Sequence, residues 1–402
     1  MRRFFNNILS LLLKGVLVWG MCACTNEIKN ISVETEDILG QLRARDMEKW
    51  AKERQLQQRQ DESDRMYNQR VAEMYDAYYK ALRDYKNSDH KIVYGWFGGW
   101  SATEGIPESF LSNLPDSVDA VSIWGGTAPF EENSSKWADL KYAQEVKGLR
   151  VLLCWQVGTS GLGLPGGVED FDRRHEGRTS EEKAVIYAQE LTEFIKKHHF
   201  NGYDIDWEPN VGNHGGGCHN LYQNCTGGES SAPIKAFIRE MGKNFGPKQV
   251  TDYNPRNTGT LFLFDGEVRD LASRFGDMGD YFDYFLNQNY FGKEPNHEFR
   301  NVNAIKDFSW KKYITCDEFE MAGAWKQGGK SPGEGNLAGC EVKAKMVAER
   351  NYGGWGAYHI ELEAAQNYKY VKSVTQIMNP SEGIKVDENQ IENILNLSLI
   401  HI

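Results

Sequence analysis

The sequence predicts an α/β fold in which eight parallel strands and the helices between them close into a (β/α)8 barrel, preceded by an N-terminal helical extension. From Lys91 onward, short apolar segments of strand length alternate with segments of helical periodicity, which is the rhythm of a parallel sheet. The chain has 402 residues, 40% of them hydrophobic, which is enough for one barrel of about 250 residues and an extension. A barrel of this kind has its active site at the carboxyl ends of its strands.

Eight strands are expected between residues 92 and 360. They are Ile92–Phe97, Val118–Trp124, Arg150–Trp155, Gly202–Glu208, Leu261–Phe264, Phe282–Tyr290, Lys312–Cys316 and Gly354–Ile360. The clearest helices are Ser180–His199, Pro233–Phe245, Cys340–Asn351 and Tyr368–Met378. These units predict a TIM barrel as the domain of residues 91–380.

Residues 1–24 have the pattern of a signal peptide. Met1-Arg2-Arg3 precedes an apolar run to Met21 that is too short to span a membrane and is interrupted by Lys14. The run ends in Met21-Cys22-Ala23-Cys24, which resembles a bacterial lipoprotein signal with Cys24 as the lipidated residue. We therefore expect a protein of the cell envelope, anchored by lipid, at the outer membrane.

Residues 25–90 are expected to form a tether and an amphipathic helix. Apolar residues recur at three- and four-residue steps near the end of this segment, at Val71, Met74, Tyr78, Leu82 and Tyr85. We expect this stripe to pack on the barrel, although a partner-binding or sugar-binding face is the alternative. The tail, residues 381–402, has no predicted role.

The composition restricts the class of ligand. A net charge of −11 argues against nucleic-acid binding, which needs clustered Lys and Arg. The 11 Trp and 19 Tyr residues suit sugar rings, which stack on aromatic faces, although many of these side chains will belong to the core.

Five of the seven cysteines lie beyond the signal segment. Cys218 and Cys225 share a Gly-rich loop and are expected to form a local disulfide, with Cys316 and Cys340 as a second candidate pair. Cys154 lies in a predicted strand, as a buried thiol. A metal site in the Gly-rich loop is the alternative, although its spacing fits no standard zinc pattern; its ligands would be His214, Cys218, His219 and Cys225.

The strand that begins after Asn201 carries an unusual row of acids. Asp204, Asp206 and Glu208 alternate along it and therefore share one face, while the opposite face is apolar. Carboxylates held close together raise at least one pKa, which keeps an acid protonated for donation to a leaving group. The alternative is a solvated edge strand, but the preceding helix favours a buried parallel strand.

This run resembles the DGxDxDxE signature of glycoside hydrolase family 18, the chitinases and endo-β-N-acetylglucosaminidases. Gly202 and the three acids match, and Asn201 stands in place of the first Asp. The resemblance implies substrate-assisted retaining hydrolysis with Glu208 as acid and base. Asp206 would orient the 2-acetamido group, Asp204 would share a proton with Asp206, and Tyr290 would donate to the acetamido oxygen. This mechanism needs no metal or cofactor, and we expect the protein to be a monomer.

Gln288 and Tyr290 form a second group, because alternation points both side chains into the barrel mouth. Without further context they would be buried polar side chains bonded to backbone. Within the family, however, they resemble the Gln-x-Tyr of many endo-β-N-acetylglucosaminidases rather than the Met-x-Tyr of many chitinases. We therefore expect Gln288 to indicate the substrate class.

Other residues are candidates for binding the sugar. The resemblance makes Tyr358 the aromatic floor, where chitinases have Trp, with open space above Gly354 and Gly356. Without the resemblance, a core aromatic residue is the alternative for Tyr358. The insert 209–232 would shape the groove. Four further side chains could line the mouth, of which the first three could instead fill the barrel: Tyr94, Trp96, Trp124 and Gln156.

The leading hypothesis is an endo-β-N-acetylglucosaminidase that cuts the N,N'-diacetylchitobiose core of N-glycans on glycoproteins. A chitinase is the nearest alternative. A surface glycan-binding protein without activity is the third, and the presence of Glu208 argues against it, because a binding protein needs no proton donor.

Overall fold

The computed structural model describes residues 76, 79–157, 166–208 and 231–380. The predicted signal peptide with Cys24, the tether and the tail lie outside these residues. Residues 79–86 are helical, and the predicted stripe residues Leu82 and Tyr85 are buried. The predicted packing of this helix on the barrel stays a prediction. A separate compact unit comprises Lys91–Leu114 and Val118–Met378.

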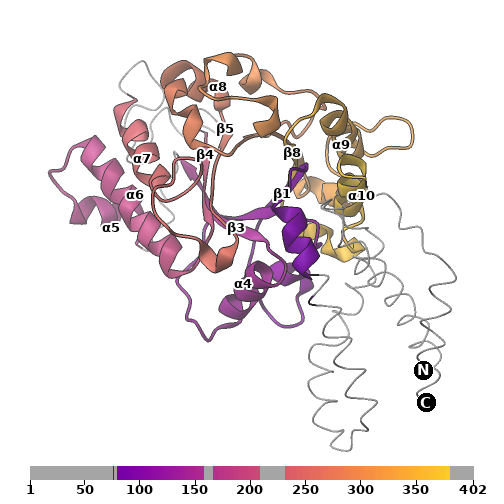
Figure 1. Cartoon of the computed structure of the whole chain (residues 1–402), viewed down its shortest axis with the longest axis horizontal. Helices are drawn as coiled ribbons and strands as arrows, with labels where there is room; N and C mark the ends of the chain where they lie inside the picture. The colour runs from indigo at the N-terminus through magenta and orange to yellow at the C-terminus, as the bar shows by residue number, and fades with distance from the viewer. Residues whose placement is uncertain (1–75, 77–78, 158–165, 209–230, 381–402) are drawn as a thin grey trace, which may run out of the picture. The chain divides into compact units, whose positions relative to one another are not determined.

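Eight parallel strands close into a barrel in the order of the chain, from β1 to β8, which confirms the predicted fold (Figure 1). The strands are β1 Ile92–Phe97, β2 Ala120–Trp124, β3 Arg150–Val157, β4 Gly202–Trp207, β5 Leu261–Gly266, β6 Tyr284–Asn287, β7 Tyr313–Glu318 and β8 Gly354–Tyr358. β1 pairs with β8 and closes the barrel.

Helices surround the strands (Figure 1). They are α4 Ser135–Glu145, α5 Gly167–Arg174, α6 Ser180–Lys197, α7 Ala232–Gly242, α8 Val268–Asp270, α9 Gly339–Arg350 and α10 Lys369–Met378. The start of α6 follows from its sequence, because Thr179 and Glu182 cap each other's backbone amides. Between β5 and β7 the connections are mostly short 3-10 turns rather than long helices.

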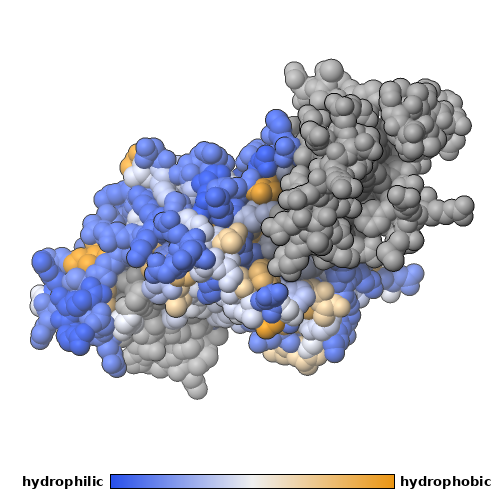
Figure 2. All heavy atoms as spheres, turned by 90° about the horizontal axis from the view of Figure 1, so that it is seen from below, coloured by the Kyte–Doolittle hydropathy of each residue, from blue (hydrophilic) through white to orange (hydrophobic). Residues whose placement is uncertain are grey.

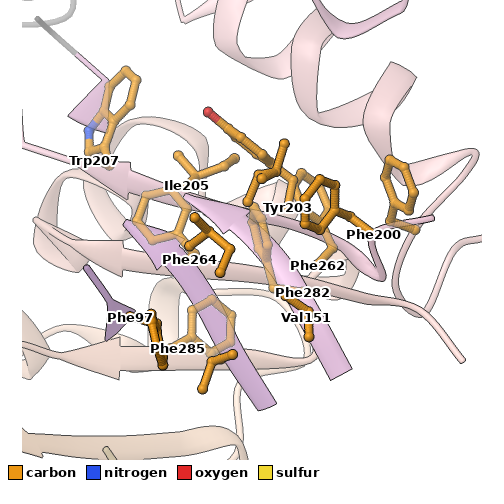
Figure 3. Close-up of a cluster of buried hydrophobic side chains, with 14 of the residues drawn as sticks. Phe97, Val151, Phe200, Tyr203, Ile205, Trp207, Phe262, Phe264, Phe282 and Phe285 are labelled. Atoms are coloured by element: carbon orange, nitrogen blue, oxygen red, sulfur yellow. The ribbon is translucent and has the colours of Figure 1, made fainter. Parts of the chain in front are cut away.

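The strand residues divide between two apolar layers. Outward side chains pack under the helices, among them Phe97, Ile205, Phe264 and Phe285 (Figure 3). Inward side chains such as Leu152, Leu263 and Leu286 form a smaller cluster inside the barrel. Alternation therefore fixes which face of each strand can carry polar groups toward the interior.

Predicted and observed strand bounds differ by a few residues, and two of the differences affect the mouth of the barrel. β6 ends at Asn287 rather than Tyr290, because the last backbone pairing with β7 joins Asn287 to Thr315. β8 ends at Tyr358, since Ile360 already begins the 3-10 helix η11, Ile360–Gln366. Both corrections fall at carboxyl ends of strands, where the chain leaves the sheet to form the mouth.

On the face that Figure 2 shows, the described residues are mostly hydrophilic, with hydrophobic side chains in small groups. Large apolar residues that remain exposed are Ile106, Val250, Phe291, Trp310, Met321 and Leu337. Among the described residues, no helix combines the length and the apolar content that crossing a membrane requires.

Candidate active site

β4 carries its acids on the inner face. Asp204 and Asp206 are 0% and 1% exposed, and Glu208, directly after the strand, is 7% exposed. The outward residues Tyr203 and Trp207 belong to the apolar layer under the helices (Figure 3). β4 also pairs with strands on both sides, so the alternative of a solvated edge strand is wrong.

Asp204 is held by two donors from β1. Its Oδ2 accepts from the Tyr94 hydroxyl at 2.7 Å and from Trp96 Nε1 at 3.0 Å. Burial raises the pKa of Asp204, although the hydrogen bond from Tyr94 favours the ionised form and opposes the shift. Trp96 is only 1% exposed, so the structure supports the alternative in which it fills the barrel.

Asp206 faces a fourth acid, Asp265 on β5, which no sequence motif singles out. The two residues are partners in the register of β4 and β5, and both are buried. Burial raises the pKa of each carboxyl, and the neighbouring acids raise it further. Alternation along β5 could have identified Asp265, because Leu261 and Leu263 of the same face point inward.

β5 ends in a glycine that lies against the backbone before Glu208. Gly266 lies opposite Trp207 and has a φ of +81°, in the left-handed region. A Cβ on Gly266 would lie 2.5 Å from Trp207 O and 3.1 Å from Glu208 Cγ. Any larger residue would therefore clash with the backbone of Trp207 and crowd the Glu208 side chain.

Gln288 and Tyr290 follow β6 and contribute to the same interior. Gln288 Nε2 lies 3.4 Å from Asp206 Oδ1 and 3.3 Å from Asp265 Oδ2, so one amide faces both carboxyls. Tyr290 packs beside Tyr358, with ring centroids 6.1 Å apart. Burial, together with a nearby thiol and the acids, raises the pKa of Tyr290, so its phenol remains a proton donor.

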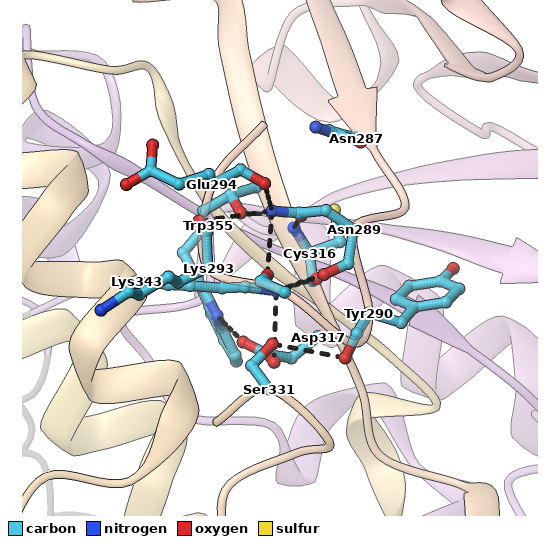
Figure 4. A network of polar contacts seen from close by, with 12 residues as sticks. Asn287, Asn289, Tyr290, Lys293, Glu294, Cys316, Asp317, Ser331, Lys343 and Trp355 are labelled. Atoms are coloured by element: carbon cyan, nitrogen blue, oxygen red, sulfur yellow. Dashed lines mark hydrogen bonds and ion pairs between the residues drawn. The ribbon is translucent and has the colours of Figure 1, made fainter. Parts of the chain in front are cut away.

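The backbone between these two residues is anchored by a buried lysine (Figure 4). Lys343 Nζ on α9 donates to Asn289 O at 3.0 Å and to Cys316 O at 2.6 Å, and it lies 3.3 Å from Asp317 Oδ1. Both side chains of the ion pair are 0% exposed. The Asn289 side chain in turn accepts from Thr315 Oγ1 at 2.8 Å, which ties the loop after β6 to β7.

The row of acids, the proton-donating phenol and the closed barrel agree with a comparison against known families. A family model described as glycoside hydrolase family 18, BT1044-like, matches residues 60–315, which is more than half of the 402 residues. The chain belongs to glycoside hydrolase family 18.

The proteins to which this chain is similar are distant from it in sequence. Endo-beta-N-acetylglucosaminidase F2 of Elizabethkingia meningoseptica is 23% identical over 316 residues, which cover 74% of this chain and 84% of the relative. An endochitinase of Brugia malayi is 24% identical over 143 residues, 34% of this chain and 25% of the relative. The solved structure of a point variant of BT1044 is 24% identical, covers 77% of this chain and 94% of its own, and has a TM-score of 0.61. This structural similarity shows a shared fold.

The one mismatch to the family 18 signature lies away from the acids. Asn201 is fully buried before β4, where its Oδ1 accepts from Gln144 Nε2 and Val151 N, each at 2.8 Å. Its Nδ2 donates to Thr258 Oγ1 and Gly259 O, each at 2.7 Å. An aspartate could not make the last two bonds, so the asparagine serves the local structure.

Aromatic rings border the acids of this family 18 barrel. Tyr358 at the end of β8 is partly exposed and meets Trp124 and Trp96 edge to face, at centroid distances of 5.7 and 6.4 Å. Trp124 is also partly exposed, so both rings are available to a ligand. Their roles in sugar binding stay predictions.

The space expected above Gly354 and Gly356 is not open, and that expectation is wrong. A Cβ on Gly354 would lie 2.2 Å from Ile92 O of the neighbouring strand. One on Gly356 would lie 3.0 Å from Tyr94 Cδ1 and 3.3 Å from Cys316 Sγ. These glycines therefore allow β8 to close against β1 and the inner residues, rather than making room for a sugar.

Several predicted residues lie outside what the structure describes. Gln156 belongs to β3 and is the register partner of Asp206, but its side chain is not among the described ones. The insert is described only from residue 231. The predicted disulfide and the alternative metal ligands of that insert fall in the part that is not described: His214, Cys218, His219 and Cys225.

The candidate disulfide between Cys316 and Cys340 does not form, because the two thiols lie on opposite sides of the barrel wall. Cys316 belongs to the inner cluster and Cys340, on α9, to the outer layer, and both are free. Cys154 is a free buried thiol, as predicted. In the described part of the chain, Cys154, Asp204 and Asp265 bring ligand atoms within 4.8 Å of one another, as a metal site would require. Burial raises the pKa of the Cys154 thiol, which keeps it protonated and opposes metal binding there.

Proposed function

We propose that the chain is an endo-β-N-acetylglucosaminidase, which hydrolyses the β-1,4 linkage in the N,N'-diacetylchitobiose core of N-glycans. The observation that carries the proposal is the row of Asp204, Asp206 and Glu208 at the carboxyl end of β4, inside a closed barrel. Gln288 beside Asp206, and a relative named endo-beta-N-acetylglucosaminidase F2, support this substrate over chitin.

The reaction would proceed in two steps through an oxazolinium intermediate. In the first, the substrate's acetamido oxygen attacks the anomeric carbon while Glu208 protonates the leaving oxygen. In the second, Glu208 takes a proton from water, and that water attacks the anomeric carbon. Because both attacks invert the centre, the product retains its configuration.

The remaining residues would orient and stabilise the acetamido group. Asp206 would accept from its N–H and stabilise the positive charge of the oxazolinium, and Tyr290 would donate to its oxygen. Asp204, held by Tyr94 and Trp96, would share a proton with Asp206 and so influence its charge. None of these steps needs a metal or a cofactor.

Product analysis tests the proposal. Glycoproteins with high-mannose, hybrid and complex N-glycans, and chitin oligomers, would be incubated with the protein, and the products identified by mass. Cleavage should leave one N-acetylglucosamine on the asparagine, and N-glycoproteins should react much faster than chitin oligomers. Faster cleavage of chitin would identify a chitinase, and binding of glycans without cleavage would identify a binding protein.

Glu208→Gln supplies the mechanistic control for the same assay. The amide cannot donate a proton, so glycan release should be abolished while glycan binding is largely kept. The surface variant Glu349→Gln, at a side chain 62% exposed, should react like the unmodified protein. Undiminished turnover by Glu208→Gln would refute the assigned acid.

The cellular location is part of the proposal and rests on the N-terminal motif alone. Lipid attached to Cys24 would anchor the enzyme to the outer membrane, near glycoproteins of the surroundings. Labelled fatty acid should be incorporated into the protein and lost in Cys24→Ala. Equal labelling of both proteins would exclude this anchor.

A further inference from the structure

Asp265 is a buried acid to which the mechanism above assigns no role. It lies at the level of Asp206 on the neighbouring strand and is 0% exposed. Gln288 Nε2 is within 3.4 Å of one oxygen of each of these carboxyls, so the two acids share a donor. The other oxygen of Asp265, Oδ1, is buried and makes no hydrogen bond within the described structure.

Among the described residues, the groups that face Asp265 come from most of the barrel, and they are acids or neutral donors rather than cations. Its strongest electrostatic neighbours are Asp206, Asp204 and Glu208. It also interacts with titratable side chains on β1, β3, β7 and the loop after β6, namely Tyr94, Cys154, Cys316 and Tyr290. Several ionised carboxylates in such a site would repel one another without compensation, so protons must neutralise part of the group.

We propose that Asp265 is a positioning residue that keeps its proton in the working enzyme and donates it in a hydrogen bond to Asp206. Asp206 is then the charged member of the pair, as a partner of the acetamido group has to be. This role rests on the proposed function. Asp265 does not touch the substrate, and its proton stays in place through both steps of the reaction.

The geometry favours Asp265 over Asp206 as the holder of the proton. An ionised Asp265 would leave Oδ1 as a buried anionic oxygen without a donor, which is costly, whereas a neutral carboxyl carries little charge there. Asp206 lies two residues before Glu208 on the inner face of β4, beside the place where the positive charge of the intermediate would form. The Gln288 amide can then donate to the ionised Asp206, while Asp265 supplies a second donor.

Two variants with side chains of similar size at position 265 distinguish a hydrogen-bonding role of Asp265 from a role in packing. Asp265→Asn keeps a donor beside Asp206 and carries no charge, so it imitates a protonated Asp265. In its pH profile of kcat/KM, the apparent pKa of each limb should lie within about half a pH unit of the value for the unmodified protein. Asp265→Leu fills the space without a donor. Its acidic limb should move up by about one to two pH units, which corresponds to the loss of a hydrogen bond to a charged group.

Other profiles would overturn the proposal. If Asp265 were ionised in the working enzyme, Asp265→Asn would remove a negative charge near Glu208. The pKa of Glu208 would then fall, because less negative charge stabilises its proton. The basic limb of the profile would therefore move down by a pH unit or more. An unchanged acidic limb in Asp265→Leu would show that Asp206 needs no donor from β5. Substrate for these assays is the glycopeptide or chitin oligomer that the protein cleaves.

A spectroscopic measurement tests the proton directly and needs no substrate, so it remains decisive if the proposed function fails. The infrared difference between the unmodified protein and Asp265→Asn at neutral pH should contain the carbonyl stretch of a protonated carboxyl. If Asp265→Asn does not fold, carbon-13 NMR of the unmodified chain with labelled aspartate replaces the comparison. A spectrum in which every aspartate is ionised at neutral pH would overturn the proposal.

Discussion

The hydroxyl of Tyr94 on β1 donates to Oδ2 of Asp204 on β4 over 2.7 Å, across the interior of the barrel. Tyr94→Phe removes this donor and leaves the weaker one from Trp96 at 3.0 Å. The pKa of Asp204 should then rise further, because the lost bond favoured the ionised form. We expect kcat to fall about 10-fold and the free energy of unfolding to fall by about 1–2 kcal/mol.

A matched control is Tyr187 on α6, which packs against the outer side of β4. The Tyr187 hydroxyl lies 3.4 Å from that of Tyr203, under the helices. Tyr187→Phe deletes the same atom from an equally buried site, and kcat should not change. An equal loss of kcat in both variants would mean that Tyr94 matters only for stability. Steady-state kinetics and urea unfolding measure the two quantities.

Gln288→Glu would add a carboxyl between Asp206 and Asp265, since Nε2 of Gln288 faces both acids. The new charge repels its neighbours and the shared donor is lost, so kcat/KM at neutral pH should fall at least about 100-fold. Activity relative to the unmodified protein should recover as the pH falls, because a protonated Glu is neutral like Gln.

In Gln288→Glu, the pH dependence of kcat/KM distinguishes an effect of the added charge from an effect of the changed side-chain geometry. A loss that is the same at every pH would show that the amide acts only through its geometry. Gln189→Glu on the exposed face of α6 introduces the same charge at the surface and should leave the profile unchanged.

Lys343→Met should destabilise the fold strongly. It leaves Asp317 buried with one remaining side-chain donor in the network, Trp355 Nε1 at 2.8 Å, and such unpaired charges typically cost about 3–5 kcal/mol. Lys345→Met, two residues along α9, breaks an ion pair that is 62% exposed and should change stability by less than about 0.5 kcal/mol. Urea unfolding measures both.

A double variant, Lys343→Met with Asp317→Asn, tests the cause. Removing the orphaned charge should restore part of the lost stability. No recovery would mean that the lysine acts mainly through its bonds to Asn289 O and Cys316 O, and not by pairing the carboxylate.

The sequence could predict those features of the fold and the site that depend on patterns within a single segment of the chain. The inward face of Asp204 and Asp206 follows from alternation within one strand, and the fold follows from the rhythm of strands and helices. The contact of Gln288 with Asp265 depends on the register of separate strands, which no local pattern encodes. The extended pattern after Asn287 also continues beyond the last backbone pairing, which explains why β6 was predicted too long.

The cysteine prediction failed for a related reason. Spacing along the chain does not tell which side of the barrel wall a side chain occupies. Cys316 points inward from β7 and Cys340 packs outside on α9, so the wall separates two thiols that the sequence made candidates for pairing.

Glu363 gives the stability of the fold a pH dependence that can be measured. The residue is 0% exposed, and its carboxyl accepts from the amides of Tyr370 and Val371 at 2.6 and 3.0 Å, in the first turn of α10. Burial outweighs these bonds and raises its pKa from 4.5 to about 7. The folded chain therefore holds a proton between these pH values that the unfolded chain has lost.

This proton determines the sign of the effect. The contribution to stability is complete below pH 4.5 and is lost as the pH rises through about 7, by up to about 3 kcal/mol. Glu363→Gln cannot ionise, so its free energy of unfolding should fall less between pH 5 and pH 8 than that of the unmodified protein. It should also be less stable at pH 5, since one backbone amide loses its acceptor. Urea unfolding at a series of pH values measures both slopes, and the exposed variant Glu349→Gln should keep the original slope. Parallel slopes for Glu363→Gln and the unmodified protein would show that Glu363 is ionised in the fold throughout this range.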